Sequence, residues 1–247
     1  MSETILYDLP SRGDKPACWS LNPWKARMAL NYKGIPYRTE WTEYPDLAPT
    51  FKELGIAPNE EGSTFEYSSP AVRLPDGSYV MDSRKIALAL DIYQPEPTLH
   101  MGYADVIDRA QNAVSGVLGT LAPIVLPRVP VMLLNDKSAK YFNETREARF
   151  GISLPELGVS DKAKGAWEEA KPKMEELRQV LTEKEGKYVL GDEVSFADFV
   201  VAGFWVFMKK VDQGGDKGGD IFGNVMGFDD AFPRHMEACS KWLERED

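Results

Sequence analysis

The first third of the chain alternates short apolar runs with an amphipathic stretch of helical spacing. Ile5–Asp8 is an apolar run that predicts a strand, and Pro36–Trp41 alternates with period two like a second strand. Between them, Pro23–Lys33 has the periodicity of an amphipathic helix. A strand, a helix and a strand within so few residues predict a right-handed parallel βαβ unit.

A hairpin and two further helices complete this sheet. The apolar runs Ala71–Leu74 and Ser78–Met81 flank Asp76-Gly77, which is a strong signal for a hairpin turn. Leu47–Leu54 predicts a short helix, and the stretch from Asp82 to about Tyr93 predicts another. The resulting order, βαβαββα, predicts a small sheet with helices on its faces.

The pattern changes after Pro95-Glu96-Pro97, because no later stretch predicts a strand. Periodicity predicts helices over 103–121, 137–149, 161–183 and 196–210 and from about residue 229 onwards, with a glycine-rich surface loop at 214–219. Ser195 as N-cap and Asp198 at the third helical position mark the start of the most apolar helix. We therefore expect an α/β domain over 1–94, a linker over 95–102 and an all-α domain over 103–247.

Composition and charge narrow the classes of partner. The chain has 247 residues and a formal net charge of −10, which argues against nucleic acid or an anionic membrane as the main partner.

With only Cys18 and Cys239, no disulfide framework is expected, which favours a reducing, cytoplasmic location. The N-terminus lacks the basic and apolar pattern of a signal peptide. The apolar window Val114–Leu134 is broken by prolines, so we expect a buried or pocket-lining segment and no membrane span.

Histidine and cysteine give little support to a metal site or a hydrolase. His100 and His235, the only histidines, lie far apart and have no neighbours at ligand spacing. We therefore expect no bound metal. Cys18 is interpreted as a small buried apolar residue in preference to a nucleophile.

Ser20 is the first candidate for chemistry. We expect Asn22 to cap the first helix and Pro23 to occupy its first position, which places Ser20 just outside the helix N-terminus. Unpaired N–H groups and the helix dipole favour an anion there, such as a thiolate or a phosphate. The alternative, a capping serine in an ordinary loop, stays open on this stretch alone.

Two more polar pairs lie at strand ends of the same sheet. Ser69-Pro70 directly precedes a strand, where a proline marks a turn or a strand start. Asp82-Ser83 follows a strand and starts a helix, which simple helix capping also explains. Together with Ser20 they lie where α/β folds bind ligands.

These motifs, in this order and spacing, resemble the glutathione transferase superfamily over essentially the whole chain. Ser20–Arg27 is similar to the active-site helix of its serine-type members, and Ser69-Pro70 matches the position of its cis-proline. Asp82–Ile86 resembles its glutathione signature, and Val194–Asp198 its helical capping box. The sequence around Ser20 most resembles that of the fungal FuA class and the related bacterial β-etherases. Ser69 in place of an aliphatic residue and the polar insertion 56–68 depart from the family pattern.

The resemblance implies a thioredoxin-like domain that binds glutathione as co-substrate. Ser20 would stabilise the glutathione thiolate, with Asn22 as a second polar group near the sulfur. The Ser69 backbone, next to Pro70, would hold the cysteinyl backbone, and Asp82 and Ser83 the γ-glutamyl group.

A hydrophobic pocket for a second, aromatic substrate is expected between the domains. Its candidate lining residues, which are otherwise simply core, are Trp19, Leu121, Pro123, Leu126 and Pro127. The resemblance also implies a homodimer. The predicted activity is transfer of glutathione to, or its removal from, hydrophobic or aromatic electrophiles, with peroxide reduction as a further activity. The alternatives are a non-catalytic, ligandin-type binding protein and a glutathione-dependent β-etherase; serine at position 20 argues against thiol transfer.

Overall fold

The computed structural model describes residues 3–212 and 221–247. A four-stranded mixed sheet forms the first part, from β1 (Thr4–Asp8), β2 (Tyr37–Trp41), β3 (Ala71–Arg73) and β4 (Tyr79–Met81), in the order β2-β1-β3-β4. β1 pairs parallel with β2, and β3 pairs antiparallel with both β1 and β4. Every residue of β1 is buried, so it is the central strand of the domain.

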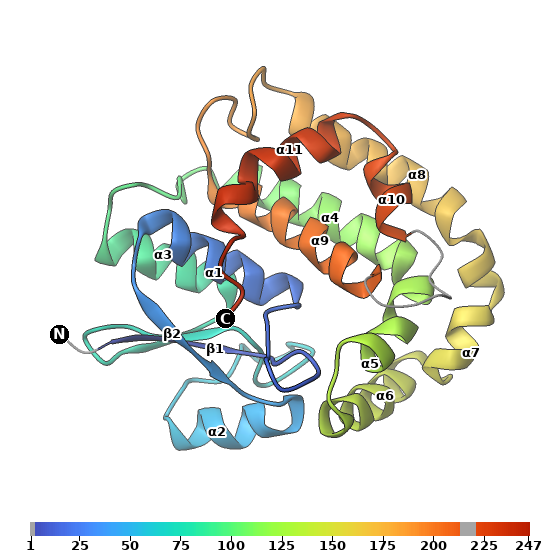
Figure 1. The fold of residues 1–247 in the computed structure, drawn as a ribbon, viewed down its shortest axis with the longest axis horizontal. Helices are drawn as coiled ribbons and strands as arrows, with labels where there is room; N and C mark the ends of the chain where they lie inside the picture. The colour runs from blue at the N-terminus through green and yellow to red at the C-terminus, as the bar shows by residue number, and fades with distance from the viewer. Residues whose placement is uncertain (1–2, 213–220) are drawn as a thin grey trace.

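Helices cover both faces of this sheet, as the alternating pattern predicts. α1 (Leu21–Lys33) and α3 (Ser83–Tyr93) lie together on one face, and α2 (Leu47–Glu53) lies on the other (Figure 1). A short 3₁₀ turn, η1 (Tyr44–Asp46), precedes α2. Gly77 has φ +92 in the turn between β3 and β4, a conformation that favours glycine. The predicted order βαβαββα is confirmed.

The second part of the fold is all-helical. Its elements are α4 (Ala104–Val125), η2 (Leu126–Arg128), α5 (Val129–Met132), α6 (Asp136–Phe150), α7 (Leu154–Val159), α8 (Asp161–Thr182), α9 (Phe196–Asp212), α10 (Ile221–Met226), α11 (Ala231–Cys239) and η3 (Ser240–Trp242). The predicted loop at 214–219 lies outside the described residues. α4 is longer than predicted and runs through Pro123, with Leu121 and Val125 on its buried side. Burial of this face compensates for the hydrogen bond that the proline removes.

α9 forms the core of this part and also contacts α1. All but three of its residues are buried, and it packs against α4 as well. Its start is fixed by Asp198, whose Oδ2 accepts from the Ser195 backbone N–H at 2.7 Å and from the Ser195 hydroxyl at 2.8 Å. Oδ1 accepts from the Val189 N–H at 2.7 Å. Such charge-assisted bonds stabilise a helix start, in agreement with the predicted cap.

One helical stretch of the described residues, Ala104–Met132, is long and apolar enough to cross a membrane by length and composition. In this fold its first helix, α4, packs along α8 and α9. The buried face of α4 therefore has protein partners, whereas other apolar side chains of the stretch, such as Val131, are exposed.

Candidate functional site

The N-terminus of α1 differs from the prediction in one respect that matters for chemistry. α1 begins at Leu21, so Ser20 is its N-cap, and Asn22 lies within the first turn. The Ser20 backbone is extended, with φ −82 and ψ 139, and its carbonyl accepts the Trp24 N–H at 3.2 Å. Its hydroxyl makes no capping hydrogen bond. The hydroxyl is therefore available to a ligand at the positive end of a 13-residue helix.

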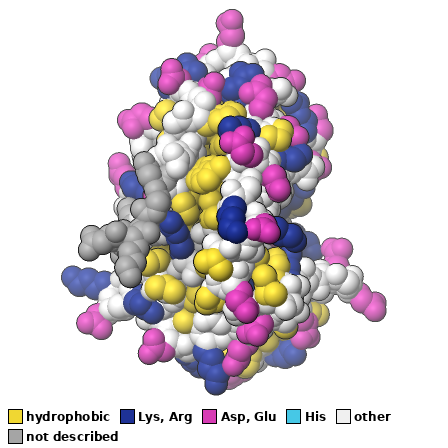
Figure 2. All heavy atoms as spheres, turned by 90° about the vertical axis from the view of Figure 1, so that its right-hand side faces the viewer, with side chains coloured by type: hydrophobic (Ala, Val, Ile, Leu, Met, Phe, Trp, Pro, Cys, Tyr) yellow, Lys and Arg dark blue, Asp and Glu magenta, His cyan; other side chains and the backbone are white. Residues whose placement is uncertain are grey.

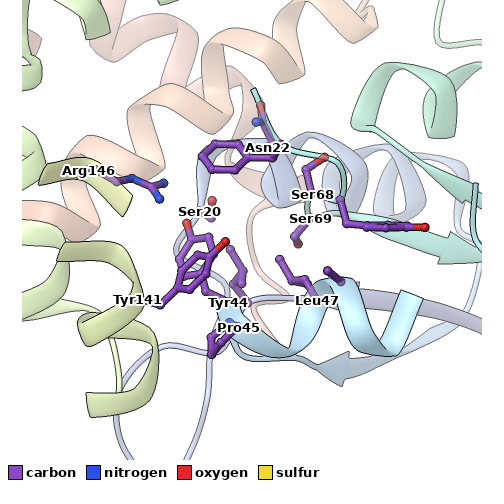
Figure 3. A pocket seen from close by; sticks show the side chains of 13 residues that line it. Ser20, Asn22, Tyr44, Pro45, Leu47, Ser68, Ser69, Tyr141 and Arg146 are labelled. Carbon is purple, nitrogen blue, oxygen red and sulfur yellow. The ribbon is translucent and has the colours of Figure 1, made fainter. Parts of the chain in front are cut away.

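Ser20 opens into a cavity of about 280 Å³. The side chains that line it are Leu9, Ser20, Asn22, Tyr44, Pro45, Leu47, Ala48, Phe65, Tyr67, Ser68, Ser69, Tyr141 and Arg146. Figure 3 shows Ser68 and Ser69 on one side of Ser20 and Arg146 on the other, on α6. The cavity thus has a hydroxyl-rich side from the sheet domain and a side that carries a cation from the helical domain.

The structure brings the other predicted glutathione-binding residues to the same edge of the sheet. The Ser69-Pro70 peptide bond is cis, and Ser69 lines the cavity. The Asp82 N–H donates to the Pro70 carbonyl at 3.1 Å, which places Asp82-Ser83 directly beside this turn. Asp82 caps α3 by accepting from the N–H groups of Arg84 at 2.9 Å and Lys85 at 3.1 Å. Its φ of +85 is rare for a residue other than glycine and is typical of residues held for a function.

The five residues predicted for the hydrophobic pocket do not line this cavity. Trp19 is 2% exposed and Leu121 is fully buried in the core. The Trp19 indole donates to the Pro10 carbonyl at 3.2 Å, and its ring lies 6.3 Å from that of Tyr44. Trp19 therefore supports a wall of the cavity from behind without facing it.

Pro123 and Pro127 pack against α7. A Cβ on Gly158 of α7 would lie 3.3 Å from the Pro127 ring and 3.9 Å from the Pro123 carbonyl. Leu126 also packs against the core. The proline-rich segment packs against α7 and does not line the cavity. The helical-domain residues that line the cavity, Tyr141 and Arg146, belong to α6.

That wall contains residues which the sequence reasoning missed. Tyr141 of α6 stacks on Tyr44, with ring centres 6.0 Å apart and planes at 15°. Arg146 lies about one and a half turns further along the same helix, and its guanidinium is 5.6 Å from the Tyr44 ring centre. The i, i+4 spacing of Phe142 and Arg146 in the predicted helix places these two residues on one face, which was the available signal. Tyr44, which stacks on this wall from the sheet domain, had no such signal.

Burial determines the protonation of the groups around the cavity. It raises the pKa of Tyr44 to about 12, so its hydroxyl stays protonated at neutral pH. Burial lowers the pKa of Arg146, yet a guanidinium remains a cation at neutral pH. In α1, burial lowers the pKa of Lys25 to about 8, and its ammonium donates to Gln111 Oε1 at 2.7 Å.

Cys18 and the histidines take no part in the cavity. Cys18 is fully buried, and burial together with the Asp8 carboxylate raises the pKa of its thiol well above the ordinary value. It is therefore a poor nucleophile, in agreement with its interpretation as a core residue. His235 is buried between the Trp205 indole N–H, at 3.1 Å, and Asp198, at 3.1 Å. Among residues 3–212 and 221–247, no group of three or more His, Cys, Asp or Glu side chains is placed to hold a metal ion.

Comparison with known proteins identifies the family. Residues 19–91 match the family model of the glutathione S-transferase N-terminal domain, and residues 110–242 that of the C-terminal domain. The chain is 30% identical over 244 residues to the glutathione S-transferase-like protein ustS of Aspergillus flavus, covering 92% of this chain and 85% of that protein.

Solved structures of fungal enzymes have the same fold. The glutathione S-transferase CsGST63524 of Ceriporiopsis subvermispora, in complex with glutathione, is 32% identical with a TM-score of 0.85, over 98% of each chain. Glutathione transferase GSTFuA3 of Phanerochaete chrysosporium is 29% identical with a TM-score of 0.84, over 98% of this chain and 97% of that chain. Both family models and the shared fold show that the chain belongs to the glutathione S-transferase family.

Proposed function

We propose that this protein binds glutathione in the Ser20 cavity and transfers its thiolate to a hydrophobic or aromatic electrophile. The observation that carries the proposal is the Ser20 hydroxyl, which makes no capping bond and lies at the start of α1, inside the cavity. A thiol-bearing ligand whose sulfur accepts this hydrogen bond gains stabilisation only as the thiolate. Ser20 acts as a hydrogen-bond donor in this mechanism and does not become a nucleophile.

The Ser20 hydroxyl and the N-terminus of α1 can together lower the thiol pKa of glutathione by the required amount. A free thiol ionises near pKa ~8.5, and lowering it by two units takes about 2.7 kcal/mol. One charge-assisted hydrogen bond contributes about 1.5–3 kcal/mol, and a helix N-terminus about 0.3–1 kcal/mol. Ser20 and the end of α1 are therefore sufficient, and Asn22 adds a further polar side chain at the cavity.

The remaining polar groups are assigned to the rest of the tripeptide. The Ser69 backbone would pair with the cysteinyl backbone, and Asp82 and Ser83 would hold the γ-glutamyl ammonium and carboxylate. The hydrogen bond from the Asp82 N–H to the Pro70 carbonyl keeps Asp82-Ser83 next to Ser69, which supports this assignment. Residues 1–94 are thus proposed as the glutathione-binding domain and 103–247 as the domain that completes the electrophile pocket. The relative from Ceriporiopsis subvermispora, solved with glutathione, supports this co-substrate.

The thiolate absorbance of bound glutathione tests the proposal. In the wild type we expect a thiol pKa about two units below that of free glutathione, and in Ser20→Ala a return towards the free value. Ser115→Ala, which removes an exposed hydroxyl of α4 outside the cavity, is the matched control and should titrate like the wild type. If bound glutathione titrates in the wild type as it does in water, the activation mechanism is wrong.

The aromatic wall favours one second candidate, a ligandin-type binding protein. Tyr44 and Tyr141 stack beside Ser20 and can hold a flat ring without any reaction. Unchanged affinity for aromatic ligands in Ser20→Ala, with no electrophile turned over by the wild type, would favour this function over catalysis.

A further inference from the structure

A cation that pairs with no carboxylate in the described part of the chain faces the side of the cavity that the glutathione assignment leaves free. The Arg146 guanidinium lies 3.9 Å from the ring centre of Phe142 on its own helix and 5.4 Å from that of Phe65 in the insertion 56–68. Figure 3 shows it directed into the cavity, on the other side of Ser20 from Ser68 and Ser69. It is therefore placed beside a second substrate that approaches the sulfur.

Several arginines of this acidic chain form ion pairs within its described part, whereas Arg146 is held by other groups. The chain carries 39 Asp and Glu residues, and Arg27, Arg84 and Arg109 each form an ion pair. Arg146 forms none with any carboxylate in the described parts of the chain, and its side chain donates to Thr145 Oγ1 at 2.8 Å. The guanidinium lies against aromatic rings and hydrogen-bonds to Thr145 and Tyr44, and because a guanidinium has five N–H donors, others remain for an anion.

We propose that Arg146 selects aromatic electrophiles that carry a carboxylate, which it binds while the ring lies against Tyr44 and Tyr141. A guanidinium binds a carboxylate through two parallel hydrogen bonds, and partial burial strengthens both. The inference rests on the proposed function and adds the chemical class of the second substrate. In the reaction, the glutathione thiolate attacks the ring carbon that bears a halide, the C–S bond forms, and the halide leaves with the electron pair of the broken bond.

Two glutathione conjugates that differ only in charge test this inference. S-(4-carboxy-2-nitrophenyl)glutathione carries the carboxylate on its ring, and in its carboxamide analogue the ring substituent is neutral and of similar size. Calorimetric dissociation constants for both would be measured on wild type, Arg146→Gln, Arg146→Lys and Arg149→Gln. Arg149→Gln removes the same charge from an exposed position on α6 and is the matched control. The rates of glutathione transfer to 4-chloro-3-nitrobenzoate and to 4-chloro-3-nitrobenzamide would be compared on the same variants.

We expect the wild type and Arg149→Gln to bind the carboxylate conjugate at least about 10-fold more tightly than the carboxamide. Arg146→Gln should bring this ratio close to one, and Arg146→Lys should keep part of it. The same ratio in Arg146→Gln as in the wild type, or a wild-type preference for the carboxamide, would overturn the inference. So would an equal loss of affinity for glutathione itself, because Arg146 would then hold the tripeptide. Failure of the wild type to bind glutathione at all would overturn the proposed function first.

Discussion

At the scale of single residues, α1 carries polar groups whose surroundings decide their chemistry. Ser20 gives its carbonyl to the helix and leaves its hydroxyl to the cavity. Lys25, just over one turn later, is 2% exposed and has a pKa lowered to about 8 by burial. This buried ammonium donates to an amide oxygen, and the attraction of the Asp82 carboxylate offsets only part of its desolvation, so it costs free energy in the folded state. The same helix thus combines a polar group that faces the cavity with one whose burial is destabilising.

Replacing Lys25 by Met should stabilise the protein at neutral pH. The shift from 10.5 to about 8 corresponds to at most about 3.5 kcal/mol, since each pKa unit is worth about 1.4 kcal/mol. Between these two values the unfolded chain binds more protons than the folded one, so wild-type stability rises with pH. The advantage of Lys25→Met should therefore shrink from pH 8 upwards and vanish above about pH 10.5. Urea denaturation at several pH values measures it.

An exposed lysine provides the control for this change. Lys171 of α8 has a side chain that is 57% exposed, and Lys171→Met should change the free energy of unfolding by less than about 0.5 kcal/mol at any of these pH values. A Lys25→Met protein less stable than the wild type at pH 7 would show that the ammonium has a compensating partner.

At the scale of elements, the contact between α1 and α9 positions the start of α1. A Cβ on Gly203 of α9 would lie 2.9 Å from the Leu21 carbonyl and 3.5 Å from the Trp24 Cβ. Only a residue without a side chain lets the two helices approach so closely. This contact holds the first turn of α1, and with it Ser20, against the core of the helical domain.

Two glycine-to-alanine changes in helices should have opposite effects. Gly203→Ala forces α1 away from α9 and should lower the free energy of unfolding by about 1–3 kcal/mol. Gly119 lies on an exposed part of α4, where an added Cβ would meet no atom within 4 Å. Gly119→Ala should therefore raise the free energy of unfolding by up to about 1 kcal/mol, because alanine has the higher helix propensity. Chemical denaturation measures both. Equal effects of the two changes would refute a close contact at Gly203.

At the scale of the whole molecule, exposed apolar side chains gather on two faces. Leu88 and Ile92, 50% and 74% exposed, share one side of α3, and Tyr103 precedes α4. α3 and α4 are joined there by the Arg84–Asp108 ion pair. Figure 2 shows the other face, where hydrophobic side chains lie along the middle of the surface formed around α6, α7 and α8. Val159, 74% exposed, belongs to α7.

We expect the α3 face to form the interface of a homodimer, the assembly that the family resemblance implies. The wild type should elute with twice the chain mass of 27.7 kDa in light-scattering chromatography. Ile92→Glu places a charge in the expected interface and should yield the monomer. Val159→Glu, at equal exposure on the other face, should leave the dimer intact. A monomeric wild type, or a dimer lost only in Val159→Glu, would contradict this assignment.

Much of the architecture is determined locally and could therefore be predicted from the sequence. The apolar run of β1, the period-two alternation of β2, the Asp76-Gly77 turn and the Ser195–Asp198 cap act through neighbours in the chain. The motifs at Ser20, Ser69 and Asp82 depend on short spacings, and the fold places them at one edge of one sheet. Such features can be predicted from the sequence because secondary structure and helix caps depend on a few adjacent residues.

Only the tertiary structure decided which side chains surround Ser20. Tyr44 and Arg146 lie about a hundred residues apart in the chain and meet because α6 packs beside η1. Apolar residues such as Leu121 and Trp19 are equally suited to a core or a pocket, so the periodicity that predicts their helix or loop cannot predict which of the two they enter. The proline-rich segment after α4 packs against α7 and does not reach the cavity, which is lined instead by α6 with Tyr141 and Arg146.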